Sequence, residues 1–491
     1  MKQYLLGIDV GTTGTKTLLF SADGTLIGHA YRGYPLSTPH VGWSEQNPQD
    51  WWQAVVETVR EVCNEQEIAQ NVAAISMSLQ GGTIVATDKA GTPLCPAIVW
   101  NDGRCNEEKE AFLKEFGNAD RMYQATGWHL GDGLPALVIR WLREHKPEVF
   151  ENAAYFLSVP DYLALKMTGI PAVDISDAGI NQLCDIRRRE YDEQLLSFAG
   201  IQRGQLPDIL PSGTVIGNLT PEAAEELGLS ENTVLVTGAH DQYAVALGAG
   251  ACHDGDILIG SGTCWVVTAI SENADFASGL SQSVAAVPGM WGSLQSLSSG
   301  GICLDWLRNK VSGEGTLSYE ALNREVATRQ AAENGLFFYP FSGKSGESTN
   351  FHTASFVGLD IAHDRFDMAR AVMEGIVFQV LWMMESFRAK PGEDGIILAG
   401  GASKSPVWAQ LLSDISGLPV RIPEVADLAC VGAAILAGVG CGIYPDAQTG
   451  HGTLAVKERV LQPNLNRTQI YKPLFAQYKK IAEILENISW R

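Results

Sequence analysis

The chain has 491 residues, of which 45% are hydrophobic and 19% charged, and its formal net charge is −21. This composition excludes a disordered or collagen-like chain, and the length leaves room for two or three domains. The acidic balance argues against nucleic acid or an anionic membrane as the main partner, because both require a positive face. The nine cysteines are scattered and the first residues carry no secretion signal, so we expect a cytoplasmic protein with reduced thiols.

The first predicted elements are a strand at residues 4–10, a turn at 11–14 and a second strand at 17–20. The two glycines of the turn let backbone N–H groups point inward around an anion, and its threonines add hydroxyl donors. Asp9 can hold Mg²⁺, and Lys16 supplies a mobile cation. The segment matches neither the Walker nor the Rossmann fingerprint, and the alternative is a plain hairpin turn with exposed threonines.

A predicted helix at residues 51–62 and strands at 72–78 and 84–88 continue the α/β alternation. The segment from Trp100 to Arg104 follows them. Its tryptophan offers a flat apolar face to a sugar ring, and its amide, carboxylate and guanidinium groups offer partners to hydroxyls. The alternative is a turn that caps a helix beginning near residue 106.

An apolar run over residues 233–237 leads to the segment Gly-Ala-His-Asp-Gln at 238–242. Its aspartate, Asp241, then lies just past a strand end, where open α/β sheets carry their ligands. A carboxylate there can accept the proton of a substrate hydroxyl as that hydroxyl attacks a γ-phosphate. His240 is a rival base, and an aspartate in this position more often only caps a helix.

A second strand, turn and strand follow at residues 256–260, 261–263 and 264–270. The turn contains Gly262 and Thr263 and weakly resembles the first one. The simplest account is two similar α/β domains, 1–245 and 246–491, which clamp one polyphosphate between their turns. A structural turn without a ligand is the alternative.

The clearest helix signal follows a predicted strand at 396–401: Ser405 suits the N-cap, Pro406 the first helical position and Gly417 the stop. The small residues before this helix would let a flat base or ribose lie against the backbone, although simple helix–strand packing explains them equally. The uncharged stretch at 428–445 predicts a buried helix with a glycine-rich end, since a membrane span needs ~20 mostly apolar residues.

Taken in order, these segments resemble the FGGY family of carbohydrate kinases, within the actin-like ATPase superfamily. The stretches that carry the resemblance are GIDVGTTGTKTLLF, WNDGRC, VPDYLALKMTG, GAHDQYAVALGAG, GSGTCW, SSGGICLDWL and LAGGASKSPVWAQLLSDISGLPV. The resemblance implies two ribonuclease-H-like domains with an inter-domain cleft that holds ATP and Mg²⁺, and transfer of phosphate to a small sugar or polyol. It also implies a homodimer.

The resemblance assigns roles to individual residues. It makes Asp241 the general base and places Asp9 at the metal. The residues expected at the nucleotide are Gly11, Thr12, Thr13, Lys16, Gly262, Thr263, Gly300, Gly401, Ala402 and Ser405. The residues expected at the sugar are Gln80, Trp100, Asn101, Asp102 and Gln242.

WNDGRC is most similar to xylulokinases, which makes a xylulose-like ketose the first expected substrate. Xylulokinases carry Gln-Met-His-Gly where this chain has Gln80-Gly81-Gly82, and the two glycines predict a wider or differently shaped pocket. Erythritol, ribitol, ribulose and glycerol therefore stay open. A kinase for an acidic sugar would need extra cations, for which Arg104 and Arg140 are the candidates. A non-catalytic ATP-binding regulator is the alternative from another class.

Overall fold

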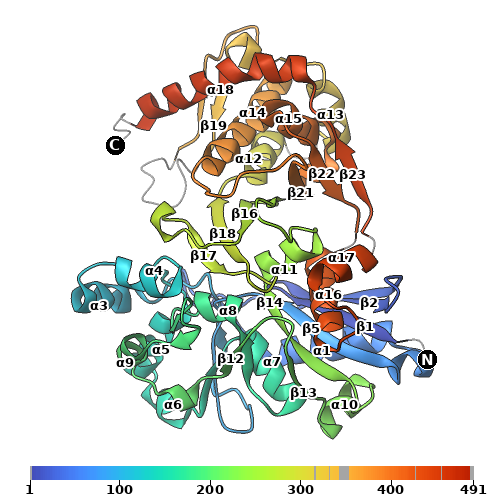
Figure 1. Ribbon diagram of the computed structural model, residues 1–491. Helices are drawn as coiled ribbons and strands as arrows, with labels where there is room; N and C mark the ends of the chain where they lie inside the picture. Colours follow the sequence, from blue (N-terminus) through green and yellow to red (C-terminus); the bar gives the residue numbers. More distant parts are fainter. Residues whose placement is uncertain are drawn as a thin grey trace.

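The computed structural model describes residues 3–313, 317–330, 332–341, 353–425, 427–454 and 456–486. These residues form two lobes, each built around one mixed β-sheet (Figure 1). We call the lobe with the six-stranded sheet the first lobe and the lobe with the seven-stranded sheet the second lobe. The predicted α/β fold with two sheet-based domains is confirmed.

The sheet of the first lobe is built on an N-terminal hairpin. Its strand order is β13 (Val215–Asn218), β14 (Val234–His240), β5 (Val72–Leu79), β1 (Tyr4–Val10), β2 (Gly14–Ser21) and β3 (Leu26–Gly33). β1 pairs in parallel with β5 and antiparallel with β2, and the register sets Asp9 opposite Lys16. The carboxyl ends of β1, β5 and β14 thus meet at one edge of the sheet, where a ligand site is expected.

Helices cover both faces of this sheet, and β1 is therefore buried on both. One face carries α1 (Pro48–Val62), α7 (Val159–Thr168) and α10 (Pro221–Leu227), and α11 (Asp241–Gly248) and α16 (Leu428–Gly440) lie on the other. Leu6 packs with the α1 side, and its neighbour Leu5 packs with the α16 side. This is the period-two alternation of a strand between two helical layers.

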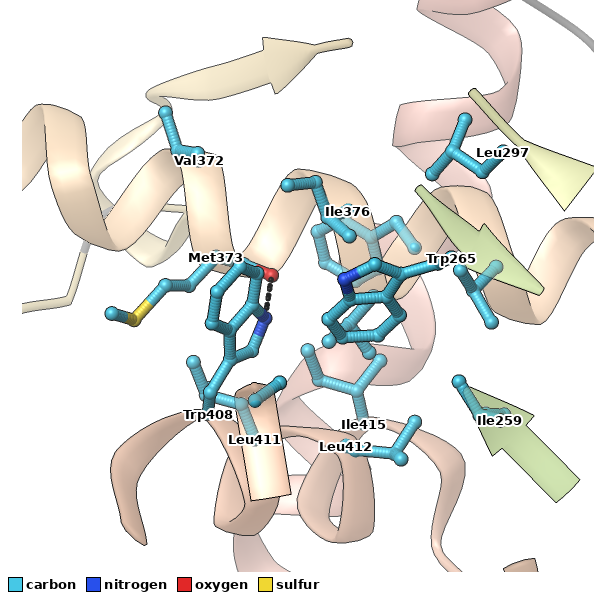
Figure 2. Packing of buried hydrophobic residues seen from close by; sticks show 14 of the residues in the cluster. Ile259, Trp265, Leu297, Val372, Met373, Ile376, Trp408, Leu411, Leu412 and Ile415 are labelled. Atoms are coloured by element: carbon cyan, nitrogen blue, oxygen red, sulfur yellow. Dashed lines mark hydrogen bonds between the residues drawn. The ribbon is translucent and has the colours of Figure 1, made fainter. Parts of the chain in front are cut away.

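The sheet of the second lobe repeats the hairpin. Its order is β17 (Ser281–Val284), β18 (Trp291–Leu297), β16 (Trp265–Ser271), β15 (Ile257–Ser261), β21 (Ile396–Gly400), β22 (Val420–Pro423) and β23 (Glu458–Leu461). Helices α14 (Arg365–Met384) and α15 (Pro406–Ser416) pack on this sheet. Figure 2 shows Trp265 and Trp408 at the centre of that core, with ring centroids 5.1 Å apart and the Trp408 indole N–H donating to the Met373 carbonyl at 3.2 Å.

Helices α11 and α16 lie between the two sheets and belong to one hydrophobic cluster that contains residues of both lobes. The helices touch at glycines: a Cβ on Gly248 would lie 2.0 Å from the Leu428 carbonyl oxygen, and one on Gly432 would lie 2.0 Å from that of Ala244. α16 follows residue 245 in the chain yet packs on β1 and β5 of the first lobe (Figure 1). The division of the domains at residue 245 stays a prediction.

The predicted helices near the site agree with the structure. Ser405 caps α15, Pro406 opens it and Gly417 ends it with a positive φ, while α16 is the predicted buried helix. None of the helices in the described ranges is long and apolar enough to span a membrane. All nine cysteines are free.

The remaining elements complete the two lobes. They are β4 (Glu45–Gln46), α2 (Gln66–Ala69), β6 (Val85–Thr87), β7 (Ala97–Ile98), α3 (Asn106–Phe116), α4 (Asp120–Thr126), α5 (Pro135–His145), α6 (Pro147–Asn152), β8 (Tyr155–Leu157), β9 (Ala172–Asp174), α8 (Ile175–Ile180), β10 (Cys184–Asp185), β11 (Glu190–Tyr191), α9 (Glu193–Ala199), β12 (Asp208–Leu210), α12 (Gly301–Trp306), α13 (Tyr319–Val326), β19 (Phe337–Tyr339), β20 (Ser355–Val357), α17 (Ala447–Leu454) and α18 (Leu465–Glu486).

Candidate active site

A cavity of about 740 Å³ lies between the two lobes. Side chains of the first lobe form one wall, and residues of β16, β18 and α14 contribute to the other. The predicted site residues that line the cavity are Thr12, Gln80, Trp100, Asp241 and Gln242. Segments more than 200 residues apart in the chain therefore meet at one place, which makes this cavity the candidate active site.

Asp241 is the first residue of α11, directly after β14 ends at His240. Its side chain is 39% exposed, and Oδ1 lies 3.4 Å from Nδ1 of the buried His240 ring. The backbone N–H of His240 donates to Ser176 Oγ at 2.9 Å, which ties the end of the strand to α8. The carboxylate thus faces the cavity from the end of a strand that is tied to α8.

The turn between β1 and β2 is anchored through its carbonyl groups. The carbonyl oxygens of residues 11, 12 and 13 accept hydrogen bonds from Tyr34 Oη (2.6 Å), Gln46 Nε2 (2.6 Å) and Tyr31 Oη (3.3 Å) in that order. In a trans peptide the N–H points opposite to the C=O, so the amide edge of the turn faces away from these partners. An arrangement of this kind suits an anion.

Thr12 connects this turn to the predicted sugar residues. Its hydroxyl donates to Gln80 Oε1 at 3.0 Å and accepts from the Trp100 indole N–H at 3.1 Å. Gln80 in turn donates to Gln46 Oε1 at 3.0 Å, and Gln46 also holds the Thr12 carbonyl. One hydrogen-bonded network therefore fixes the turn and part of the cavity wall together.

Asp9 lies at the end of β1, and its side chain is 13% exposed. Burial is the main cause that raises the pKa of this carboxyl from 3.8 to about 7. The charges of Asp427 and Asp241 add to the rise, while the ammonium of Lys16 and a hydrogen bond from Ser78 lower the pKa. A buried carboxylate next to two others favours a cation in this position.

Lys16 lies across from Asp9, as the β1–β2 register requires. Its Nζ atom is 3.6 Å from Asp9 Oδ2 but only 2.6 Å from Oδ2 of Asp427. Burial disfavours the ammonium, yet the hydrogen bond and charge of Asp427, together with the charge of Asp9, raise the pKa of Lys16 above its usual value. The cation is therefore charged and is held mainly by Asp427, with Asp9 further away.

The second glycine turn is held by backbone contacts instead of charges. The N–H of Gly301 donates to the Gly262 carbonyl at 3.1 Å, and the N–H of Ile302 donates to that of Thr263 at 3.3 Å. A Cβ on Gly301 would lie 2.5 Å from the Gly262 oxygen, and one on Gly300 would lie 2.1 Å from the Trp265 ring. The glycines thus permit the start of α12 to rest against the turn.

The predicted adenine residues begin beside the same turn. The N–H groups of Gly401 and Ala402 donate to the Ser261 carbonyl (2.5 Å) and hydroxyl (3.0 Å). Ser405 lies at the start of α15, where its Oγ donates to Asn323 Oδ1 at 2.6 Å and accepts from the backbone N–H of Trp408 at 3.2 Å. Gly262, Gly300, Gly401 and Ala402 therefore form one cluster around β15.

The structure separates Trp100 from the two residues that follow it. Trp100 is 47% exposed and lines the cavity, whereas Asn101 and Asp102 do not line it. Asp102 is 2% exposed and accepts hydrogen bonds from Arg104 and from the backbone N–H of Ser44. Its carboxylate is thereby occupied inside the lobe, and its predicted role at the sugar stays a prediction.

The two glycines after Gln80 do not leave open space. A Cβ on Gly81 would lie 2.5 Å from the His240 ring and 2.9 Å from Ile180, and one on Gly82 would lie 2.7 Å from Leu134. A side chain at either position would therefore need its neighbours to move, and the expectation of a wider or differently shaped pocket stays a prediction. Larger neighbours fill the volume that a longer side chain would need.

Two features of the site were not predicted from the sequence. Asp427 was passed over because it stands as a single acid before an uncharged stretch, although its place before a helix is an N-cap signal. Trp128 and His129 line the cavity from a segment without a recognisable motif. The ring nitrogen of Trp128 has no hydrogen-bond partner within the described part of the chain.

The two-lobed fold brings a carboxylate and a glycine–threonine turn to one cavity, an arrangement that suits phosphoryl transfer. Two family models match the chain: the N-terminal domain of the FGGY family of carbohydrate kinases over residues 4–248, and its C-terminal domain over residues 256–441. The protein belongs to the FGGY family of carbohydrate kinases.

Individual relatives agree over most of the chain. The xylulose kinase of Bacillus subtilis is 30% identical over 485 residues, which cover 98% of this chain and 96% of the relative. The gluconokinase of the same organism is 29% identical and covers 89% of this chain and 87% of the relative. The crystal structure of the Rhodospirillum rubrum xylulose kinase matches with a TM-score of 0.89, at 26% identity, over 98% of this chain and 99% of that one.

Proposed function

We propose that this carbohydrate kinase transfers the γ-phosphate of ATP to a hydroxyl of a neutral small sugar or polyol, with a xylulose-like ketose as the lead substrate. Erythritol, ribitol, ribulose and glycerol are the other candidates. The observation that carries the proposal is the position of Asp241, a carboxylate that faces the inter-lobe cavity beside the anchored first turn. A cytoplasmic location remains an expectation from the cysteine pattern and the first residues, and a homodimer remains an expectation from the resemblance.

In the proposed reaction the Asp241 carboxylate accepts the proton of the acceptor hydroxyl as its oxygen attacks the γ-phosphorus. A new P–O bond forms to the acceptor, the bond to the bridging oxygen of ADP breaks, and ADP leaves. Lys16 and the amide edge of the first turn would neutralise charge on the transferred group, while Gly262 and Thr263 would hold the nucleotide from the second lobe. Closure of the lobes would exclude water, a competing acceptor.

Mg²⁺ is the ion that this chemistry implies, and the residues present fit it. Asp9 would hold the ion, because its buried carboxylate offers the hard oxygen ligand that Mg²⁺ prefers and lies in the field of two further acids, Asp427 and Asp241. The ion would offset the charge of the phosphates. Adenine is proposed to lie along Gly401, Ala402 and Ser405, where small side chains would let a flat base approach the backbone.

The chemistry of the cavity wall supports a neutral acceptor. Among the described residues, no lysine or arginine lines the cavity, and its one carboxylate is Asp241. Arg104 is instead paired with Asp102 and Glu45, and Arg140 does not line the cavity. Tryptophan faces, amides and hydroxyls suit an uncharged polyol, whereas an aldonate would face the Asp241 carboxylate with no lysine or arginine in the cavity wall and only His129 and His240 as other ring partners.

The test is an ADP-release assay with matched neutral and acidic acceptors, for example ribitol against ribonate and D-xylulose against xylonate. We expect turnover with a neutral acceptor, and we expect Asp241→Asn to fold and bind ATP but to lose kcat by several powers of ten. Near-normal turnover of that variant would refute the role of Asp241. Preference for the acidic acceptors would refute the proposal that the acceptor is neutral, but it would leave the proposed role of Asp241 standing.

A further inference from the structure

The contacts of Lys16 point to a residue that the proposed phosphate site needs and that lies at the start of α16. We propose that Asp427 is a positioning residue for Lys16: it holds the ammonium toward the terminal phosphate of the nucleotide and away from Asp9. This inference rests on the function proposed above and adds a residue to it.

Asp427 is itself held in a fixed orientation. Its Oδ1 atom accepts the backbone N–H of Cys430 at 3.0 Å and so caps α16, which leaves Oδ2 for Lys16 at 2.6 Å. The side chain is 13% exposed. Because one carboxylate oxygen caps the helix and the other binds the ammonium, the carboxylate cannot rotate without loss of a hydrogen bond.

The backbone that carries Asp427 is also fixed relative to the backbone of Lys16. A Cβ on Gly7 of β1 would lie 1.9 Å from the Cys430 carbonyl oxygen, so the strand and the first turn of α16 are in direct contact. The Cys430 thiol lies 3.5 Å from the Lys16 carbonyl oxygen. The distance between the acid and the lysine is therefore set by packed backbone and not by flexible loops.

The lysine requires such a partner because its ammonium is a point charge on a flexible four-carbon stem. Two carboxylates compete for it, and Asp427 holds it at 2.6 Å while Asp9 stays at 3.6 Å. Without Asp427 the ammonium would be free to pair with Asp9, the residue proposed for the metal. With Asp427 in place, one N–H of Lys16 is used and the others remain available to phosphate oxygens.

The experiment is a double-mutant cycle in the full-length enzyme with Asp427→Asn, Lys16→Met and both together. Asparagine still caps helices well, so the melting temperature should stay unchanged while the ion pair is lost. We expect Asp427→Asn to lower kcat/KM for ATP about tenfold or more, with the KM of the acceptor unchanged. In the Lys16→Met background, Asp427→Asn should lower kcat/KM for ATP less than twofold.

The control is Asp364→Asn, since Asp364 also caps a helix and pairs with an arginine, Arg329, at 3.0 Å, outside the cavity. It should leave the kinetics unchanged. A second readout, affinity for ATP and for ADP measured by calorimetry, should show a loss for ATP that is several times the loss for ADP, since Lys16 is positioned for the terminal phosphate.

Two results would overturn the inference. One is wild-type kinetics for Asp427→Asn. The other is an equal loss in the Lys16→Met background, because Asp427 would then act independently of the lysine. If the wild-type enzyme bound ATP but phosphorylated no acceptor, the proposed function would fail, and the difference between ATP and ADP affinity would still decide the role of Asp427.

Discussion

The two glycine turns share one scaffold but differ in what holds them. Each connects two antiparallel strands at the centre of its sheet, β1 to β2 and β15 to β16. The first turn has an acid and a lysine as opposed neighbours at its base, Asp9 and Lys16. At the same register the second turn has only uncharged residues, Gly260 and Val266.

The supports differ in the same way. Side chains of Tyr34, Gln46 and Tyr31 hold the carbonyls of the first turn, whereas backbone N–H groups at the start of α12 hold those of the second. A turn that must place charges needs side chains that fix them, while a turn that only offers backbone needs close backbone packing. One hairpin design therefore supports two kinds of phosphate contact.

The largest expected difference between the turns is electrostatic. Asp9→Asn should lower kcat/KM by at least roughly a thousandfold, about 4 kcal/mol, because the metal loses its proposed carboxylate. Steady-state kinetics at saturating acceptor measure this loss, with circular dichroism to check the fold. A variant that keeps more than a tenth of the activity would contradict the assignment of Asp9.

The raised pKa of Asp9 should also make the unfolding free energy depend on pH, and the second turn has no charged residue at the matching position. Because the pKa of Asp9 is raised from 3.8 to about 7, the folded state keeps a proton that the unfolded state has lost between these values. The unfolding free energy should therefore fall as pH rises from about 4 to 7, by at most about 4 kcal/mol from this group. Denaturant titrations should show a smaller fall in Asp9→Asn. Equal slopes in both proteins would show that Asp9 ionises normally.

The second turn should respond most to a change in backbone packing. Gly301→Ala places a Cβ 2.5 Å from the Gly262 carbonyl oxygen, so the turn must move. We expect the KM for ATP to rise about tenfold, a loss of about 1.4 kcal/mol, with little change in the KM of the acceptor. Gly392→Ala is the matched control, since a Cβ there meets nothing within 4 Å. If both variants behaved alike, close packing at the second turn would be unimportant.

The smallest expected effect separates the threonines of the two turns. Thr12→Val removes hydrogen bonds to Gln80 and Trp100 in the cavity wall and should raise the KM of the acceptor roughly three- to tenfold. The hydroxyl of the exposed Thr263 has no such partners in the described structure, and Thr263→Val should raise only the KM for ATP, about twofold. Initial-rate kinetics with each substrate varied in turn test this pair. If Thr12→Val changed only the KM for ATP and Thr263→Val changed the KM of the acceptor, the roles assigned to the two turns would be wrong.

Much of the local structure could be predicted from short-range patterns. The strand at residues 4–10, the helix predicted at 51–62 and the helix between Ser405 and Gly417 follow from apolar periodicity, caps and glycine stops, which act within a few residues. Several residues predicted for the site line the cavity, and Asp241 among them could be singled out because it stands at a strand end. Asp427 was missed, since its partner Lys16 lies 411 positions away.

The segment around Trp100 shows a second limit of prediction from sequence, because distant residues decide which of its side chains reach the cavity. Composition and the family resemblance both place Asp102 at the sugar hydroxyls; in the fold Arg104 and Ser44 occupy its carboxylate, and of residues 100–102 only Trp100 lines the cavity. The two glycines after Gln80 predict a wider or differently shaped pocket, and a Cβ on them would meet His240 or Leu134. Local chemistry does not reveal which neighbour from a distant segment will satisfy or exclude a side chain.

The sequence by itself determined the strands, the caps, the duplicated hairpin and the acid at the end of β14, because these depend on interactions between residues close in the chain. Only the tertiary structure decided that α16 returns to the first lobe, that Asp427 meets Lys16 at 2.6 Å, and which polar groups face the cavity. The physical reason is that charge pairing and burial depend on distance in space, and packing of the two sheets around α11 and α16 sets those distances.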